Sequence, residues 1–345
     1  MKSTTKIAAD RAYDQTKTVL PAEVARGVYI ENPPGAEALK LMHLLIGKAG
    51  GRMADDVRHE FRMADIKKID GMRNHTRATL RQLFIELAGA VMIFDDTEAQ
   101  CEIIGGFLDR AKLDYSHEVS DNLMVAWWFG GAFREMAEKS CHWAIMDRQT
   151  VFALSSKYSI LLFQHIASLV NLNHITSKTF SVTELRAVMG VPEGKLAQFG
   201  HFNNRAIQPA IAEINQTSRM KLTATPRKSG RTVVSITIAW EEKPQEAKQS
   251  AKAELGRPKV GRKARRDGTA ETLVMAFPDF GSVKDSQPWD RIARDNAPRI
   301  DGRHVPDLRK LADTFRKWCG EKSIPLDGSS IEKTFTTWCK SYSAR

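Results

Sequence analysis

Polar residues that could read the edges of DNA bases are concentrated in one short stretch of this sequence. They recur mostly at spacings of three and four, so a helix would carry them on one face. The members of this group are Lys195, Gln198, His201, Asn203, Asn204, Arg205 and Gln208. Amide side chains can pair with adenine in the major groove, and arginine can pair with guanine. The group therefore predicts a base-reading surface; the alternative interpretation is a solvated helix face on an ordinary α+β domain.

A basic cluster follows this group along the chain. Its members are Arg227, Lys228 and Arg231. They surround Gly230, and the alternating residues on either side, at 220–225 and 233–240, favour two strands. Glycine at this place favours a tight hairpin turn. Charged side chains at the tip of such a hairpin are suited to phosphate oxygens.

Two predicted helices position the base-reading group. The first spans 182–189, where Ser181 is an N-cap and Glu184 stands three residues later, as in a capping box. A turn at 190–192 ends it, and the second helix spans 195–215, with an apolar stripe at helical spacing. Helix, turn, helix and hairpin is the order of a winged helix. In that fold the second helix enters the major groove, and the hairpin lies against the backbone or the minor groove.

Four blocks in this part of the chain resemble the iteron-binding plasmid replication initiators. They lie at 156–160, 181–185, 202–215 and 228–231. Members of that family carry two winged helices in tandem, bind repeated sites in a plasmid origin and catalyse no covalent step. The resemblance therefore implies an α+β fold with two tandem winged-helix domains, and it adds Lys157, in the first block, to the DNA-binding residues.

The chain departs from the family pattern at Asn203 and Asn204, where the family has at least one basic residue. This departure concerns the base preference more than the fold.

The resemblance also implies a function and a set of partners. The function is sequence-specific binding of double-stranded DNA at repeated origin sites, which initiates plasmid replication with control of copy number, together with repression of the protein's own promoter. The implied partners are the direct repeats, that promoter, a second copy of the chain in a dimer, and host replication proteins such as the host initiator and the replicative helicase. The expected location is the bacterial cytoplasm, on the nucleoid or the plasmid, and no cofactor is implied.

Two other functions fit parts of the sequence. A winged-helix transcriptional regulator would use the same reading surface without a replication role, and its operator would be an inverted repeat. A DNA-processing enzyme would need a metal or nucleotide site. No two of the nine histidines are separated by one residue, and the nearest approach to a phosphate-binding loop, at 190–196, lacks Ser or Thr after Lys195. The sequence therefore predicts a protein that is not an enzyme and holds no metal.

The first half of the chain repeats the order of a winged helix. The predicted elements are a helix at 36–48, a strand at 57–61, a short helix at 63–66, a longer helix at 74–87, and strands at 91–94, 101–107 and 123–129 around a long polar loop, with a turn at 95–96. In the family this domain serves dimerisation and auxiliary DNA contacts. Its basic residues, which could form a local patch or a solvated face, are Lys67, Lys68, Arg73 and Arg77.

Five segments are predicted in all. They are a flexible arm at 1–32, a first winged helix at 33–146, a second at 147–240, a basic linker at 241–270 and a small helical domain at 271–345. The stretch 257–266 has six basic residues and no acidic one, and Pro258 and Gly261 disfavour a helix there, so it is expected to be a flexible tether.

A short motif is repeated in the last segment. The sequence Thr-Phe-x-x-Trp-Cys occurs at 314–319 and again at 334–339. Both copies lie in predicted helices, at 305–319 and 330–342, so the repeat predicts a helical hairpin with two equivalent aromatic faces.

Charge and cysteine content limit the class of protein. The net charge is +11, and residues 151–240 carry 10 basic and 3 acidic side chains, whereas residues 1–150 carry 20 and 22. Positive charge concentrated on one segment predicts a polyanionic partner and salt-sensitive binding. A membrane is not expected to be a partner, because no basic amphipathic helix with an aromatic apolar face is present. The four scattered cysteines indicate free thiols, and the N-terminus has no apolar segment of a signal peptide.

Overall fold

The computed structural model describes residues 3–12, 14–26, 29–31, 33–67, 75–96, 99–116, 123–170, 172, 175–268, 276–300, 302–327 and 331–342. The chain forms two compact units, Met1–Arg257 and Pro258–Arg345. Within the described ranges, every helix is too short or too polar to cross a lipid bilayer.

A first winged helix lies in the first unit. Its elements are α3 (Ala36–Ala49), β3 (His59–Arg62), α4 (Met63–Lys67), α5 (Arg77–Ala88), β6 (Leu108–Asp114) and β7 (Met124–Phe129). The three strands form an antiparallel sheet in the order β3-β7-β6. Trp127 on β7 is fully buried against Phe61 and Phe129, so an aromatic cluster fixes the inner face of this sheet.

A second small sheet takes two strands from the segment between α5 and β6 and one strand from the segment before α3. It consists of β2 (Tyr29–Glu31), β4 (Val91–Asp96) and β5 (Cys101–Gly106), in the order β2-β4-β5. The predicted turn at Asp95 and Asp96 is wrong, because both residues continue β4 and pair with β5. The predicted long polar loop is also wrong over 108–114, where β6 pairs with β7. Because β6 is an edge strand with mostly exposed side chains, its polar sequence resembles that of a loop.

The predicted flexible arm is wrong as well. Residues 1–32 include α1 (Thr4–Asp10), β1 (Lys17–Pro21) and α2 (Ala22–Arg26). Strand β1 pairs antiparallel with β8 (Trp143–Asp147), which follows α6 (Gly131–Lys139). The hydroxyl of Thr4 donates to the carbonyl oxygens of Ser140 (3.1 Å) and His142 (3.0 Å). These partners, Ser140, His142 and β8, lie more than a hundred residues away along the chain, so the local polarity of the segment gave no sign of its order.

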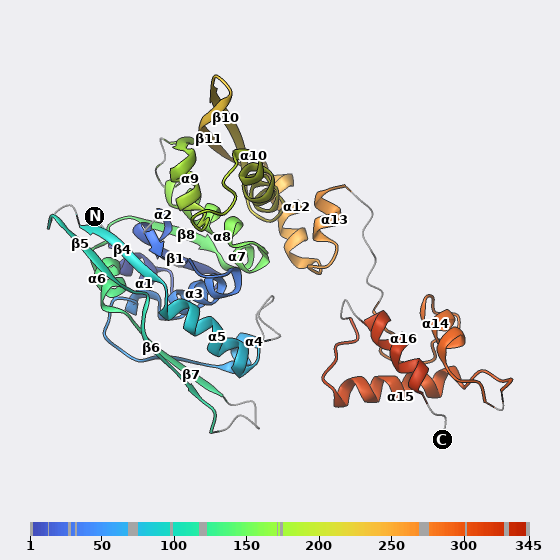
Figure 1. Ribbon diagram of the computed structural model, residues 1–345. Coiled ribbons are helices and arrows are strands. Elements are labelled where there is room, and N and C mark those ends of the chain that lie inside the picture. Colours follow the sequence, from blue (N-terminus) through green and yellow to red (C-terminus); the bar gives the residue numbers. More distant parts are fainter. Residues whose placement is uncertain are drawn as a thin grey trace. The chain divides into compact units, whose positions relative to one another are not determined.

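The second winged helix has the predicted order of elements. These are α8 (Lys157–Val170), β9 (Ser177–Ser181), α9 (Val182–Val188), α10 (Phe199–Phe202), a π-helical turn (Asn203–Ile207), α11 (Gln208–Thr217), β10 (Met220–Ser229) and β11 (Thr232–Glu242). The sheet order β10-β11-β9 matches that of the first winged helix, in which the last strand is also central. In Figure 1 the β10–β11 hairpin extends beyond the helices of its domain.

One hydrophobic core serves both winged helices. It includes residues of α3, such as Leu45, and residues of α8, such as Ile160 and Leu162. The two winged helices are joined by α7 (Arg148–Ala153), and the Nε2 atom of His43 on α3 lies 3.3 Å from Oε1 of Gln164 on α8. The two domains predicted at 33–146 and 147–240 are therefore packed into one unit.

The basic linker is more ordered than predicted. Residues 245–256 form α12, which packs on α11; Ala251 is buried, and Gln216 donates to Glu254 at 3.1 Å. A short helix, α13 (Arg262–Arg266), follows. Its N-cap residue is Gly261, which has a left-handed conformation with a φ of +85°. The expectation of a non-helical tether fails here because Gly261 precedes a helix instead of interrupting one.

The second unit contains α14 (Trp289–Asn296), α15 (Leu308–Glu321) and α16 (Ile331–Ser341). The predicted hairpin of α15 and α16 is completed by α14 and by a preceding loop. The ring centroid of Phe277, in that loop, lies within 5.1 Å of the ring centroids of Trp289, Phe315 and Phe335. These four side chains are at most 1% exposed, so they form the centre of a separate small core.

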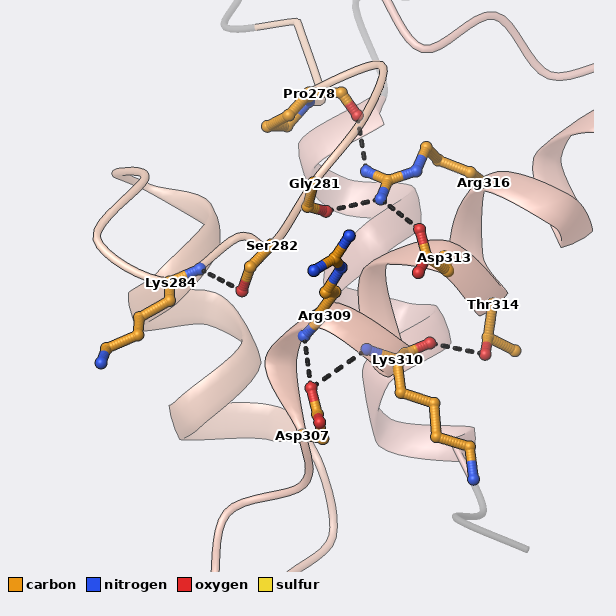
Figure 2. A network of polar contacts seen from close by, with 10 residues as sticks. All are labelled: Pro278, Gly281, Ser282, Lys284, Asp307, Arg309, Lys310, Asp313, Thr314 and Arg316. Atoms are coloured by element: carbon orange, nitrogen blue, oxygen red, sulfur yellow. Dashed lines mark hydrogen bonds and ion pairs between the residues drawn. The ribbon is translucent and has the colours of Figure 1, made fainter.

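Polar contacts fix the loop against α15 (Figure 2). The guanidinium of Arg316 donates to the carbonyl oxygens of Pro278 (2.8 Å) and Gly281 (2.5 Å), and it forms an ion pair with Asp313 at 2.6 Å. At the start of the same helix, the carboxylate of Asp307 accepts from two backbone N–H groups and caps the helix.

Candidate nucleic-acid interface

The recognition helix, defined here as residues 199–217, begins four residues later than predicted. Residues 193–196 form turns, which leaves Lys195 exposed before the helix begins at Phe199. Within the helix, the backbone N–H of Gln208 bonds to the carbonyl of Asn203, five residues back. Pro209 explains this π-helical turn, because proline has no N–H and its ring clashes with the carbonyl four residues earlier. Such turns are rare and often occur at functional sites.

An arginine that the sequence analysis missed fixes the turn before this helix. Arg186 on α9 donates to the carbonyl oxygens of Lys195 (3.0 Å), Leu196 and Ala197 (3.0 Å). Its guanidinium also lies 4.6 Å from the ring centroid of the buried Phe202. A single side chain therefore links the two helices. Its position near the end of α9 was visible in the sequence, but nothing there indicated that it points toward the turn.

The predicted base-reading residues share one solvent-facing surface. Gln198, His201, Asn204, Arg205 and Gln208 are exposed, and Asn203 is half-buried. The opposite side of the helix is buried in the core, including Phe202, Ala206 and Ile207.

Three amides of this surface form a chain of hydrogen bonds. Gln208 donates to Oδ1 of Asn203 at 3.3 Å, and Asn203 donates to Oδ1 of Asn204 at 3.2 Å. Asn203 and Gln208 are five residues apart, a spacing that the π-helical turn brings together. The contact leaves the Gln208 amide with a free acceptor and one further N–H donor, the pair that matches adenine.

The wing is the hairpin of β10 and β11, and it is exposed from 225 to 232. The turn is tighter than predicted: Ser229 pairs with Thr232, and Gly230 has a φ of +60°. Arg227 and Lys228 therefore lie in β10, at a β-bulge, and Arg227 donates to the hydroxyl of Ser235 at 3.2 Å. With Arg231 in the turn, the three basic residues of the wing are brought together at its tip.

Lys157 has a different environment from the wing. It begins α8 and is half-buried, and its ammonium lies 5.6 Å from the ring centroid of Tyr158. Burial lowers the pKa of Lys157. The helix it begins packs against the recognition helix, so Lys157 belongs to the same domain as the predicted reading surface.

The basic residues predicted for the first winged helix lie on its α4 and α5. Lys67 ends α4 and is half-buried. Arg77 begins α5 and is exposed, with its guanidinium 4.6 Å from the ring centroid of Tyr115. Lys68 and Arg73 lie outside the described residues. The positions of the predicted patch are therefore given only for Lys67 and Arg77.

Two family models match the chain, and together they cover more than half of it. The model described as initiator replication protein, first winged helix, matches residues 30–167, and the model described as initiator Rep protein, second winged helix, matches residues 181–240. The chain belongs to the initiator Rep protein family. This membership confirms the predicted family, the α+β fold with tandem winged helices, and the assignment as a DNA-binding replication initiator. Neither match extends beyond residue 240 of this initiator.

Solved structures add two similar proteins. The crystal structure of the Pi initiator protein in complex with iteron DNA has 17% sequence identity and a TM-score of 0.48, covering 67% of this chain and 99% of that chain. A crystal structure of domains 2 and 3 of RctB has 11% identity and a TM-score of 0.38, covering 60% of this chain and 82% of that one. The comparison with curated proteins gives no match.

Proposed function

We propose that this initiator binds directly repeated double-stranded sites in a plasmid origin and starts replication there, without catalysing a covalent step. The observation that supports this most is the geometry of the second winged helix. One helix presents amides and Arg205 to solvent, and the adjoining hairpin carries three basic residues at its tip. The helix would read base edges in the major groove, while the wing would hold phosphates.

The same surface would act at the protein's own promoter. A dimer would repress that promoter, and the chain would recruit host replication proteins such as the host initiator and the replicative helicase to DNA in the bacterial cytoplasm. Binding to repeats would bend or open adjacent A·T-rich DNA at pyrimidine–purine steps, which deform easily. Support for these roles comes from family membership alone.

Footprinting on the DNA that flanks the gene, at two salt concentrations, tests the proposal. We expect protection of several same-orientation repeats, spaced by roughly one or two helical turns, with weaker binding at the higher salt concentration. A single palindromic footprint over the promoter would instead support a transcriptional regulator. Salt-sensitive coating without any discrete footprint would contradict both functions.

A further inference from the structure

The two copies of the Thr-Phe-x-x-Trp-Cys motif lie in the second unit, outside the residues that the family models match. In both copies the phenylalanine and the cysteine point into the core: Phe315, Phe335, Cys319 and Cys339 are at most 1% exposed. The tryptophans, three residues after each phenylalanine, are only half-buried. The repeat therefore builds one small core and places two indole rings at its surface.

The two tryptophans line a single cleft. It has a volume of about 450 Å³, and its lining residues are Trp318, Lys333, Thr334, Thr337, Trp338 and Ser341. Lys333, Thr337 and Ser341 are four residues apart on α16, so they form one row along that helix beside the indole of Trp338. Trp318 faces them from α15. A volume of this size is within the range of small-ligand sites.

The hydroxyl groups of Thr337 and Ser341 and the ammonium of Lys333 can form hydrogen bonds with a ligand in the cleft. Thr337 donates its hydroxyl proton to the carbonyl of Lys333, and Ser341 donates to the carbonyl of Trp338, both at 2.9 Å. Their oxygens are therefore left to accept hydrogen bonds from a ligand. Lys333 is exposed, and among the described residues no carboxylate lies within ion-pair distance of its ammonium.

The composition of the cleft favours a nucleic acid over a protein as the occupant. The cores of protein interfaces are depleted in lysine and serine, yet this lining contains both, and it has no aliphatic side chain and no carboxylate. Aromatic rings that stack on bases, joined to a basic group that contacts the backbone, are the recurring elements of single-strand binding. The stretch 257–266, within which this unit begins, carries six basic residues, which would favour an approaching polyanion.

We infer that the second unit binds single-stranded DNA in the tryptophan cleft. Bases stack on the indoles of Trp318 and Trp338, the ammonium of Lys333 contacts a phosphate, and the hydroxyl oxygens of Thr337 and Ser341 accept from base N–H groups. Stacking is tolerant of sequence, so the cleft would bind any unpaired strand. This site is separate from the duplex-reading surface, and the inference does not depend on that surface binding repeats.

The first experiment measures the affinity of the full chain for a fluorescent oligothymidine of roughly 15 nucleotides, a length within known single-strand site sizes. The test variant is Lys333→Gln, and the matched control is Lys340→Gln, because both lysines are exposed on α16 and only Lys333 lines the cleft. We expect Lys333→Gln to lower the slope of log affinity against log salt by about 0.7, and Lys340→Gln to leave it unchanged. Equal slopes for the two variants would overturn the inference.

A second pair of variants tests the rings. Trp338→Ala should weaken oligothymidine binding by roughly 5- to 150-fold, whereas Phe280→Ala, an aromatic residue of the same unit that is 87% exposed and outside the cleft, should have no effect. Because Trp338 also packs 5.1 Å from Phe315, its replacement could disturb folding, and the lysine pair keeps the inference testable.

Photo-cross-linking locates the strand directly. A 5-iodouracil oligonucleotide should cross-link to Trp318 or Trp338, as mapped by mass spectrometry. Cross-links confined to 195–231, or a cleft that binds a protein but no oligothymidine, would overturn the inference. The duplex footprint serves as the independent readout, since Lys333→Gln should leave it intact whether or not the footprint has the proposed repeats.

Discussion

At the scale of single residues, Arg205 and Arg231 should differ in what they contribute to DNA binding. Arg205 lies on the exposed face of the recognition helix, and Arg231 lies in the turn of the wing. We expect Arg205→Ala to cost about 1–3 kcal/mol on the specific site and little on random DNA, because a base contact is lost. Arg231→Ala should weaken both alike and lower the salt slope by about one. Equal losses on both DNAs for Arg205→Ala would mean that it contacts a phosphate.

A second residue-scale prediction concerns the amide chain. Gln208→Ala should relax the preference for adenine at one base pair and cost about 1–3 kcal/mol. Asn203→Ala should relax the same position by a smaller amount, because Asn203 orients the Gln208 amide. Binding to a library randomised across the site would measure both, with the exposed Thr223→Ala as control. If Asn203→Ala alters a different position, Asn203 itself reads a base.

At the scale of elements, the turn before the recognition helix depends on Arg186. Arg186→Lys keeps the charge but replaces the planar guanidinium, whose two terminal nitrogens donate to three carbonyls, by a single ammonium nitrogen. We expect faster hydrogen exchange at 195–198 and a loss of about 1–3 kcal/mol in binding to the specific duplex. Lys221→Ala, on the exposed side of β10, is the control. Unchanged exchange in Arg186→Lys would show that the turn is held by other contacts.

At the scale of the whole molecule, two buried histidines should make stability depend on pH. Burial lowers the pKa of His43 from 6.5 to about 4, and burial lowers that of His165 from 6.5 to about 3. The unfolded chain takes up these protons below pH 6.5 and the folded chain does not. Stability is therefore complete above pH 6.5, and it falls by about 1.4 kcal/mol per pH unit for each histidine down to pH 4.

Urea unfolding between pH 7 and pH 5 measures this loss. His165→Leu should remove one histidine's share of the slope, and His142→Gln, which changes an exposed histidine, should leave the slope unchanged. A slope that is the same in His165→Leu and in the unaltered chain would contradict the assignment.

A second whole-molecule prediction concerns the two termini. Deleting residues 1–26 should unfold the first unit, because β8 loses its partner strand and the burial of Leu20 and Val24 alone contributes about 3–6 kcal/mol. Deleting residues 258–345 should leave the thermal unfolding of the first unit unchanged, because that segment is a separate compact unit. An unaltered melting temperature after removal of 1–26 would contradict the role of β1.

The sequence alone determined the features that depend on local periodicity and turn chemistry. Ser181 caps α9, its side chain accepting from the N–H of Glu184, and the hairpin turns at Gly230, because caps and glycine turns are decided by a few neighbouring residues. The same periodicity placed the reading surface on the correct side of its helix, since the apolar stripe had to face the core.

Only the tertiary structure decided the remaining features. The order of residues 1–26 depends on β8, the role of Arg186 depends on where the next turn lies, and the cleft of Trp318 and Trp338 depends on how α15 and α16 pack. Each of these joins residues that lie apart along the chain. A pattern read over a short window cannot contain such contacts, because their energy comes from packing between distant segments.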